Sequence, residues 1–220
     1  TGTRSLTAAL HLLGWDTVHY PVDRAALEAM MRGDVRFPHL DRYDGMTDIT
    51  VSPDSEELDK AYPGSKFVLT VRDEEGWLKS CENHWASRPA FQEAPPPGKD
   101  VSPEEHLTHM EIRRFLRAAV YASYDCHAER FRRAYRRHVE GVLAYFKDRP
   151  EDLLARHGFA AGGLRFARRI DVDRVRLLHA VRRRGDQPVG GFDDVGRRAI
   201  VVGQEGRPGG IIGLEAADEG

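Results

Sequence analysis

The chain has 220 residues, of which 40% are hydrophobic and 31% are charged, and this composition is typical of a globular protein with a substantial core. The net charge of −2 argues against bulk attraction to nucleic acid or to an anionic membrane. Two cysteines are too few for a disulfide scaffold, and no apolar run is long enough to cross a bilayer. We therefore expect a cytoplasmic protein with no nucleic-acid or membrane partner.

The amino end predicts a helix that is entered through a turn of small polar residues. Leu6, Ala9, Leu10 and Leu13 recur at the spacing of an amphipathic helix. The preceding run 1–5, Thr-Gly-Thr-Arg-Ser, offers backbone N–H groups, hydroxyls and the positive end of the helix dipole, which together favour a bound phosphate. The same residue types also cap ordinary helices, so both interpretations stay open.

Short strands and helices alternate along the next part of the chain. Strands are predicted at 17–20, 46–51 and 66–71. Helices are predicted after Asp23, from Ser52 with Pro53 in the first turn, and over 74–84. This order predicts an α/β fold with a doubly wound parallel sheet and flanking helices.

Between Trp85 and Val101 a proline-rich segment interrupts regular structure. It is interpreted either as a surface lid that contacts a substrate or as a flexible excursion. Beyond it, the capping box 102–105 predicts a helix that ends near Tyr121. Its buried side is expected to consist of Leu107, Met110, Phe115, Leu116 and Ala119.

A last helix is predicted over 127–147. A cluster of four arginines in it, Arg132, Arg133, Arg136 and Arg137, is expected to form a solvated face. On the preceding helix, His106 and His109 have a spacing compatible with a metal, but further ligands are lacking, so we expect no metal site.

Arg72 and Ser80 indicate a nucleotide-phosphate site. The run 66–71 is apolar without alternation, so Arg72 is expected at the carboxyl end of a buried parallel strand, where open α/β sheets bind ligands. Ser80 is expected about two turns into the next helix. A guanidinium and a hydroxyl from adjacent elements can hold one phosphate monoester. The alternative is an ion pair of Arg72 with a carboxylate and an exposed Ser80.

These residues resemble the P-loop sulfotransferase superfamily, in particular its bacterial branch with a loop of the form Gly-x-x-Arg-Thr-Gly-Thr-x-Ser-Leu. The block 62–66, Tyr-Pro-Gly-Ser-Lys, and the stretch 145–154 are similar as well, so the resemblance covers residues 1 to about 154. It implies a P-loop NTPase-like sulfotransferase fold. It also implies transfer of a sulfuryl group from the co-substrate 3′-phosphoadenosine 5′-phosphosulfate to a hydroxyl or amine of a small molecule or glycan.

The resemblance further implies which residues bind this sulfuryl donor. In the family an Arg followed eight residues later by a Ser holds the 3′-phosphate, and Arg72 and Ser80 match this pair. The loop around the 5′-phosphosulfate is matched by Thr1, Gly2, Thr3, Arg4 and Ser5.

The catalytic base that deprotonates the acceptor is predicted at Asp48 or at His84. Asp48 is expected near the carboxyl end of strand 46–51, on the same edge as Arg72, and carboxylates act as bases when their surroundings tune their pKa. His84 is expected about one turn beyond Ser80. The structural alternatives are an Asp bonded to neighbouring backbone and a His that only packs.

Two departures from the family pattern bear on activity. The Lys or Arg that precedes the loop in the family has no counterpart before Thr1, so we expect a chain that is truncated there and catalytically impaired. After residue 154 the composition changes, since 155–220 contains 12 Arg but no Lys, Trp or Tyr. This predicts a sulfotransferase-like domain, 1–154, and an irregular tail, 155–220, that is either a translated frameshift or a divergent end.

Three functions stay open at this point. The first is a sulfotransferase. The second is a catalytically impaired fragment that binds a nucleotide or a partner. The third, a P-loop small-molecule kinase, is disfavoured because the run 1–5 lacks the usual Gly-Lys-Ser/Thr ending.

Overall fold

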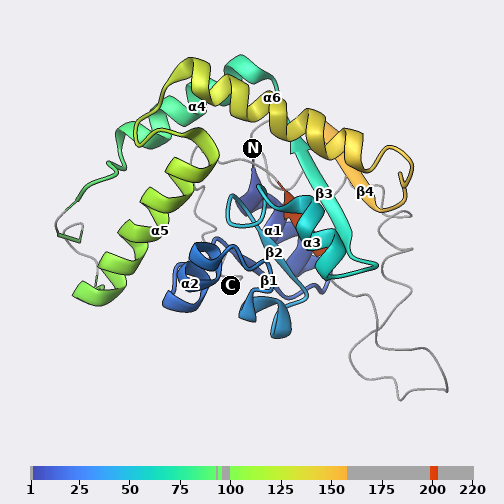
Figure 1. Ribbon diagram of the computed structural model, residues 1–220, viewed down its shortest axis with the longest axis horizontal. Coiled ribbons are helices and arrows are strands. Elements are labelled where there is room, and N and C mark those ends of the chain that lie inside the picture. The colour runs from blue at the N-terminus through green and yellow to red at the C-terminus, as the bar shows by residue number, and fades with distance from the viewer. Residues whose placement is uncertain (1, 93, 96–99, 158–198, 203–220) are drawn as a thin grey trace, which may run out of the picture.

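The computed structural model describes residues 2–92, 94–95, 100–157 and 199–202 (Figure 1). The helices are α1 (Thr3–Leu12), α2 (Arg24–Arg32), the 3₁₀ helix η1 (Pro38–Asp41), α3 (Ser55–Ala61), α4 (Glu74–Ala86), α5 (Pro103–Tyr121) and α6 (Ala128–Tyr145). The strands are β1 (Thr17–His19), β2 (Gly45–Thr47), β3 (Lys66–Val71), β4 (Leu153–His157) and β5 (Ala199–Val202). None of the helices in these ranges is long and apolar enough to cross a membrane.

The five strands form one sheet in the order β1-β2-β5-β3-β4, and each neighbouring pair is parallel. The predicted α/β class with parallel strands is therefore confirmed. Since the strands run the same way, the residues that follow β1, β2 and β3 meet at one edge of the sheet. The doubly wound arrangement stays a prediction, because the chain between β4 and β5 lies outside the described residues.

Strand β5 comes from the segment that was predicted to be an irregular tail, and for residues 199–202 that prediction is wrong. Ile200 pairs with Met46 of β2 on one side and with Phe67 of β3 on the other. Apolar β-branched residues favour such a central position, where both sides of the backbone are paired. Strand β4 also crosses the predicted boundary at residue 154. The rest of the predicted tail lies outside the described residues.

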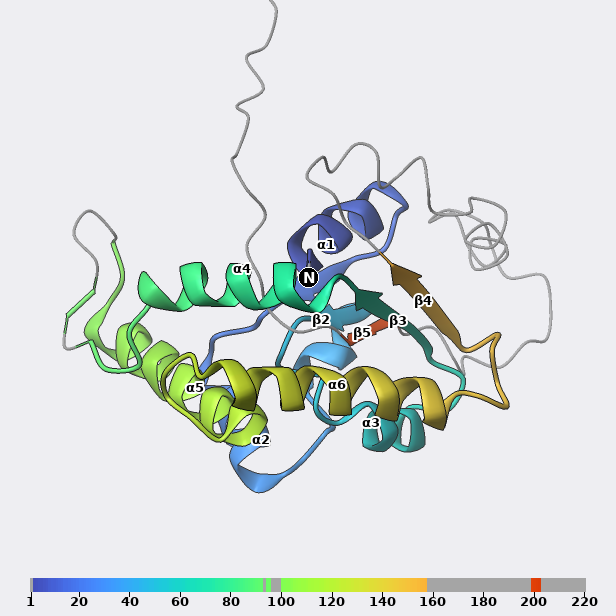
Figure 2. The same ribbon diagram turned by 90° about the horizontal axis from the view of Figure 1, so that it is seen from above.

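Helices cover both faces of the sheet, with α1 on one side of the strands and α3 and α6 on the other (Figure 2). On the α1 side, Leu6 and Leu10 pack with Val68 of β3. On the opposite side, the ring of Phe67 lies 4.8 Å from the ring of Phe146 at the end of α6. Because β3 packs on both faces, Phe67, Val68 and Leu69 are apolar in succession instead of alternating with polar residues.

Two element boundaries differ from the prediction for one local reason. Strand β2 ends at Thr47 and not at Val51, because Asp48 has a φ of 88° and turns the chain out of the sheet. Helix α3 consequently starts only at Ser55, so Pro53 lies before the helix and not in its first turn.

The capping box at the start of α5 is confirmed, with Ser102 and Glu105 bonding to each other's backbone N–H groups. The predicted buried side is partly wrong, because Leu107 is 50% exposed and Ala119 is exposed, whereas Ile112 is fully buried. Helix α5 packs against both α2 and α6, so its buried surface faces two directions instead of one stripe.

Candidate functional site

The first turn of α1 starts at the carboxyl edge of the sheet. Gly2, its N-cap, adopts a left-handed conformation with φ 92° that glycine accepts without a steric penalty. No side chain of the described residues caps the helix, so its first N–H groups depend on other partners. Thr3 is buried, Ser5 is half-buried and Arg4 is exposed. Thr1 lies outside the described residues.

Arg72 follows β3 directly, and its place is fixed by both its main chain and its side chain. The Tyr135 hydroxyl donates to the Arg72 carbonyl at 2.6 Å and accepts its N–H at 3.0 Å. The guanidinium lies over the first turn of α4, because a Cβ added to Gly76 would lie 3.6 Å from Arg72 Nη2. In both views the start of α1 lies beside the end of β3 and the start of α4 (Figures 1 and 2).

Ser80 lies on the α4 face that carries the Arg72 guanidinium. Gly76 and Ser80 are four residues apart on one helix, so they lie one above the other. Ser80 is half-buried at this position. The structure thus brings the two residues of the predicted 3′-phosphate pair to a common surface.

Helix α6 holds the start of α4 in place through ion pairs. Arg136 bonds to Glu74 at 2.6 Å, and Arg132 bonds to Glu75 at 3.0 Å. The hydrogen bond from Arg136 lowers the pKa of the Glu74 carboxyl, whereas burial raises the pKa of the Tyr135 hydroxyl. Arg132 and Arg136 are therefore structural anchors as well as members of the predicted solvated face.

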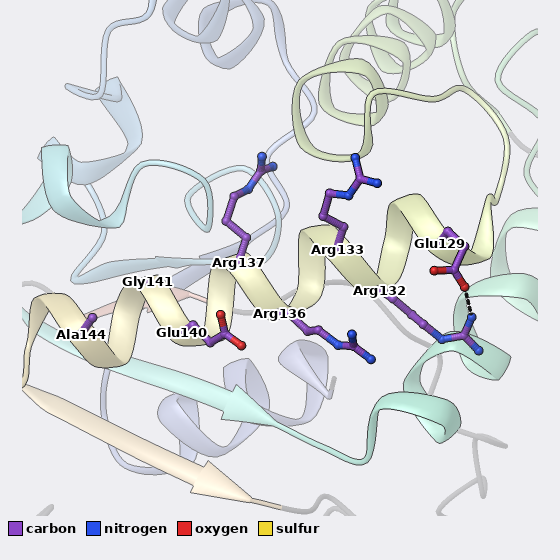
Figure 3. A pocket seen from close by; sticks show the side chains of 8 residues that line it. All are labelled: Glu129, Arg132, Arg133, Arg136, Arg137, Glu140, Gly141 and Ala144. Carbon is purple, nitrogen blue, oxygen red and sulfur yellow. Dashed lines mark hydrogen bonds and ion pairs between the residues drawn. The ribbon is translucent and has the colours of Figure 1, made fainter.

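The other two arginines of this face are exposed and point to the opposite side of α6 (Figure 3). They are Arg133 and Arg137. An open hollow beside them is lined by Glu129, Glu140, Gly141 and Ala144 together with the four arginines. Neither Arg72 nor Ser80 is among the residues that line this hollow, so we do not assign it to the site.

Asp48 lies at the sheet edge as predicted, but its carboxylate is already engaged. It is 2% exposed, and its Oδ1 atom accepts the Ile49 N–H at 2.7 Å. Its Oδ2 atom lies 3.2 Å from His19 Nε2. The expected bond to neighbouring backbone is thus present, together with an ion-pair partner that the sequence reading had not identified.

His19 is the site residue that sequence reasoning missed. It is the last residue of β1, and its side chain is 19% exposed. Its Nδ1 atom lies 2.9 Å from the Thr47 hydroxyl of the neighbouring strand. The sequence contains a feature that could have identified His19. A His at the end of a predicted parallel strand lies on the same edge of the sheet as the residues that end the other strands.

His84 lies away from Asp48, on the α4 face that carries Gly76 and Ser80. Its Nδ1 atom lies 3.0 Å from Arg88 Nη1, one turn further along the chain. The two predicted catalytic residues therefore belong to different parts of the edge, Asp48 beside β1 and His84 along α4.

Within the described ranges, no group of three or more His, Cys, Asp or Glu side chains could hold a metal ion. Cys81 is buried, and burial together with nearby Glu82 raises the pKa of the Cys126 thiol to about 11.

The fold and the site together define a parallel α/β protein in which Arg72, Ser80, His19 and the start of α1 gather near the carboxyl edge of the sheet. The model of the Sulfotransferase domain family matches residues 1–158, and the chain belongs to this family. The match covers the stretch over which the sequence resembles sulfotransferases. Neither the comparison with curated proteins nor the comparison with solved structures gives a match.

Proposed function

We propose that the protein transfers a sulfuryl group from 3′-phosphoadenosine 5′-phosphosulfate to a hydroxyl or amine of a small molecule or glycan. Family membership supports the reaction class. The observation that carries the proposal is the position of the Arg72 guanidinium beside Gly76, on the face of α4 that presents Ser80. Charge-assisted bonds from this Arg and a bond from this Ser suit the three oxygens of the 3′-phosphate.

The 5′-phosphosulfate end of the donor is proposed to bind at the start of α1. A phosphate there can accept bonds from the N–H groups of the first turn, and the helix dipole favours its negative charge. Gly2 leaves room for a close approach, because it has no side chain. We propose Gly2, Thr3, Arg4 and Ser5 for this role, and Thr1 by the family pattern.

In such a reaction the protein mainly aligns the reactants and stabilises charge. The acceptor oxygen or nitrogen forms a bond to the donor sulfur, and the bond from sulfur to the bridging oxygen breaks. That oxygen departs with the 5′-phosphate, whose growing charge the α1 N–H groups stabilise. The acceptor proton passes to a base of the protein, for which Asp48 and His84 are the candidates.

The alternative is a family member that binds the nucleotide without turnover. The desulfated donor, 3′-phosphoadenosine 5′-phosphate, tests the nucleotide site that both functions require, and the transfer assay described below separates the two functions. We expect the desulfated donor to raise the melting temperature of the protein, since a ligand that binds only the folded state stabilises that state. ADP, which lacks the 3′-phosphate, should have a much smaller effect.

Arg72→Ala tests the assignment of the 3′-phosphate site. Loss of a charged hydrogen-bonding group should weaken binding of the desulfated donor by roughly 10- to 100-fold. Arg133→Ala is the matched control, because Arg133 is exposed and points away from α4 (Figure 3). Equal affinities in both variants would remove Arg72 from the site.

Transfer itself is tested with a labelled sulfuryl donor and a panel of phenols, amines and glycans. Transfer to any acceptor supports the sulfotransferase proposal. Tight nucleotide binding without transfer to the panel would favour the binding function, and a preference for ATP with magnesium would favour a kinase.

A further inference from the structure

A path of three hydrogen bonds, with an ion-pair contact at one end, connects Asp48 to the first turn of α1. His19 lies between Asp48 and Thr47, with Nε2 3.2 Å from Asp48 Oδ2 and Nδ1 2.9 Å from Thr47 Oγ1. The Thr47 hydroxyl lies 2.8 Å from the Thr7 hydroxyl, which donates to the Thr3 carbonyl at 2.9 Å. All members except His19 are at least nine-tenths buried. The path therefore ends on the first residue of α1.

The direction of each bond follows from the number of protons available. A carbonyl only accepts, so the single hydroxyl proton of Thr7 is used on Thr3. Thr47 must then donate to Thr7, and its own proton is used as well. His19 Nδ1 must therefore donate to Thr47. Its Nε2 atom faces the Asp48 carboxylate at 3.2 Å, where a proton on Nε2 completes an ion pair. With protons on both nitrogens, the ring is an imidazolium.

A different arrangement places the second proton on the Asp48 carboxyl and not on His19 Nε2. Imidazole is the stronger base, with an ordinary pKa of about 6.5 against about 3.9 for Asp. Asp48 Oδ1 also accepts the Ile49 N–H, and such a bond favours the ionised carboxylate. Both facts place the proton on His19.

We propose that His19 is a positioning residue that works as an imidazolium, with Asp48 as its counter-ion. In this state it orients the Thr47 and Thr7 hydroxyls so that they tie the first turn of α1 to the sheet edge. The inference rests on the proposed function, because that turn is where the donor's 5′-phosphosulfate is proposed to bind. His19 thereby acts on the donor through α1, and Asp48 serves as its partner instead of as the acceptor's base.

Loss of one proton from the His19 ring reverses the donor and acceptor roles along the path. Neutral His19 with a proton on Nε2 accepts at Nδ1, so Thr47 turns toward it, Thr7 turns toward Thr47, and the bond to the Thr3 carbonyl is lost. Other ionisable side chains packed near β1 include His11 of α1, bonded to the Thr17 carbonyl at 2.8 Å, and His109 of α5. The ring of His109 lies 6.1 Å from the ring of Tyr20.

A second His–Asp pair provides an internal comparison. His39 Nε2 lies 2.6 Å from Asp23 Oδ2, but His39 Nδ1 is buried and has no hydrogen-bond partner among the described residues. No path of hydroxyls continues from this ring. The path from His19 to α1 is thus a specific feature of the sheet edge and not a general property of His–Asp pairs.

Thr7→Val tests the inference, because the Thr7 hydroxyl bonds to Thr47 and Thr3 and valine has nearly the same shape as threonine. Without the Thr7 hydroxyl, Thr47 is released to donate to His19 Nδ1. In ¹⁵N-histidine spectra at pH 7.5, assigned with His19→Gln, we expect His19 to change from two protonated nitrogens toward one. Affinity for 3′-phosphoadenosine 5′-phosphate should fall roughly 3- to 10-fold, as the loss of one hydrogen bond implies.

Thr70→Val is the matched control, because the buried Thr70 hydroxyl has no hydrogen-bond partner in the described part of the chain. It should leave the His19 signals and the nucleotide affinity unchanged, and Thr7→Ser should restore both. The proposal would be overturned if only one nitrogen of His19 is protonated in the wild-type protein. It would also be overturned if the protonation of His19 is the same in Thr7→Val as in the wild-type protein.

Asp48→Asn gives a second, independent measurement if Thr7→Val does not fold. A positioning pair predicts that Asp48→Asn lowers nucleotide affinity and the protonated fraction of His19 together. If Asp48 were instead the acceptor's base, the substitution would abolish transfer and leave affinity intact. Absence of nucleotide binding in the wild-type protein would count against the proposed function, whereas the His19 spectra would still decide the protonation state.

Discussion

Tyr135 of α6 holds the main chain of Arg72 through both of its polar groups, donating to the carbonyl at 2.6 Å and accepting the N–H at 3.0 Å. The residue that follows β3 is thereby bonded to a helix residue 63 positions later in the chain. The Tyr135 ring also stacks on Trp77 of α4, with ring centroids 4.6 Å apart. One side chain therefore fixes the relative positions of β3, α4 and α6, on which the geometry of Arg72 depends.

Tyr135→Phe should lower both stability and nucleotide affinity. The substitution leaves the Arg72 N–H and carbonyl without their partner, and an unpaired buried polar group costs about 1–3 kcal/mol. We expect a lower unfolding midpoint in urea and weaker binding of 3′-phosphoadenosine 5′-phosphate by calorimetry.

Tyr145→Phe is the control on the same helix, since the Tyr145 hydroxyl donates to Asp59 at 2.9 Å, away from Arg72. It should reduce stability without changing nucleotide affinity. If both variants bind the nucleotide equally well, the clamp on Arg72 has no part in binding.

Gly76 is expected to be needed for the position of the Arg72 guanidinium. A Cβ at this position would lie 3.1 Å from Asp73 Oδ2 and, at an ordinary contact distance, 3.6 Å from Arg72 Nη2. The two further methyl groups of Gly76→Val are therefore expected to crowd the guanidinium. We expect nucleotide affinity to fall roughly 10-fold, the equivalent of about one charged hydrogen bond.

Gly141→Val is the matched change in α6, where an added Cβ meets no atom within 4 Å. It should preserve affinity and slightly raise helix stability, because glycine is the weaker helix former. Unchanged binding by Gly76→Val would show that the guanidinium has room to move.

Much of this edge could be predicted because strand ends follow from local sequence. The apolar run 66–71 placed Arg72 at the end of β3, and Ser80 followed from helical spacing. The His19–Asp48 pair could not be derived in the same way, since it depends on the register of β1 against β2, in which His19 faces Thr47. The early end of β2 at Asp48, with φ 88°, likewise depends on tertiary contacts that override the strand propensity of 49–51.

Strand β5 leads to a prediction about the sheet as a whole. Ile200 pairs with β2 on one side and β3 on the other, so Ile200→Pro removes a ladder hydrogen bond from a central strand. We expect a loss of about 3 kcal/mol or more in the free energy of unfolding, measured in urea.

Ile200→Val keeps the backbone N–H and the β-branched character, so it should melt close to the wild-type temperature. An unchanged free energy of unfolding in Ile200→Pro would mean that residues 199–202 do not complete the sheet in solution. The same result would restore the prediction of an irregular tail over these residues.

His138 on α6 predicts how stability depends on pH. Burial lowers the pKa of His138 to about 4 from its ordinary value of 6.5, and its Nε2 atom is fully buried with no hydrogen-bond partner among the described residues. Between pH 6.5 and 4 the unfolded chain therefore binds a proton that the folded protein does not. Stability is complete above pH 6.5 and falls as the pH drops toward 4, by up to about 3 kcal/mol from this residue.

Urea unfolding at pH 7.5 and pH 4.5 measures this dependence. His138→Leu removes the buried titrating group, so its free energy of unfolding should fall less between the two pH values than that of the wild-type protein. His127→Gln is the control, because His127 is exposed at the start of α6 and its loss should leave the wild-type difference unchanged. An equal pH dependence in His138→Leu and the wild-type protein would mean that His138 is protonated within the folded protein, and that its Nε2 atom is then accessible to water.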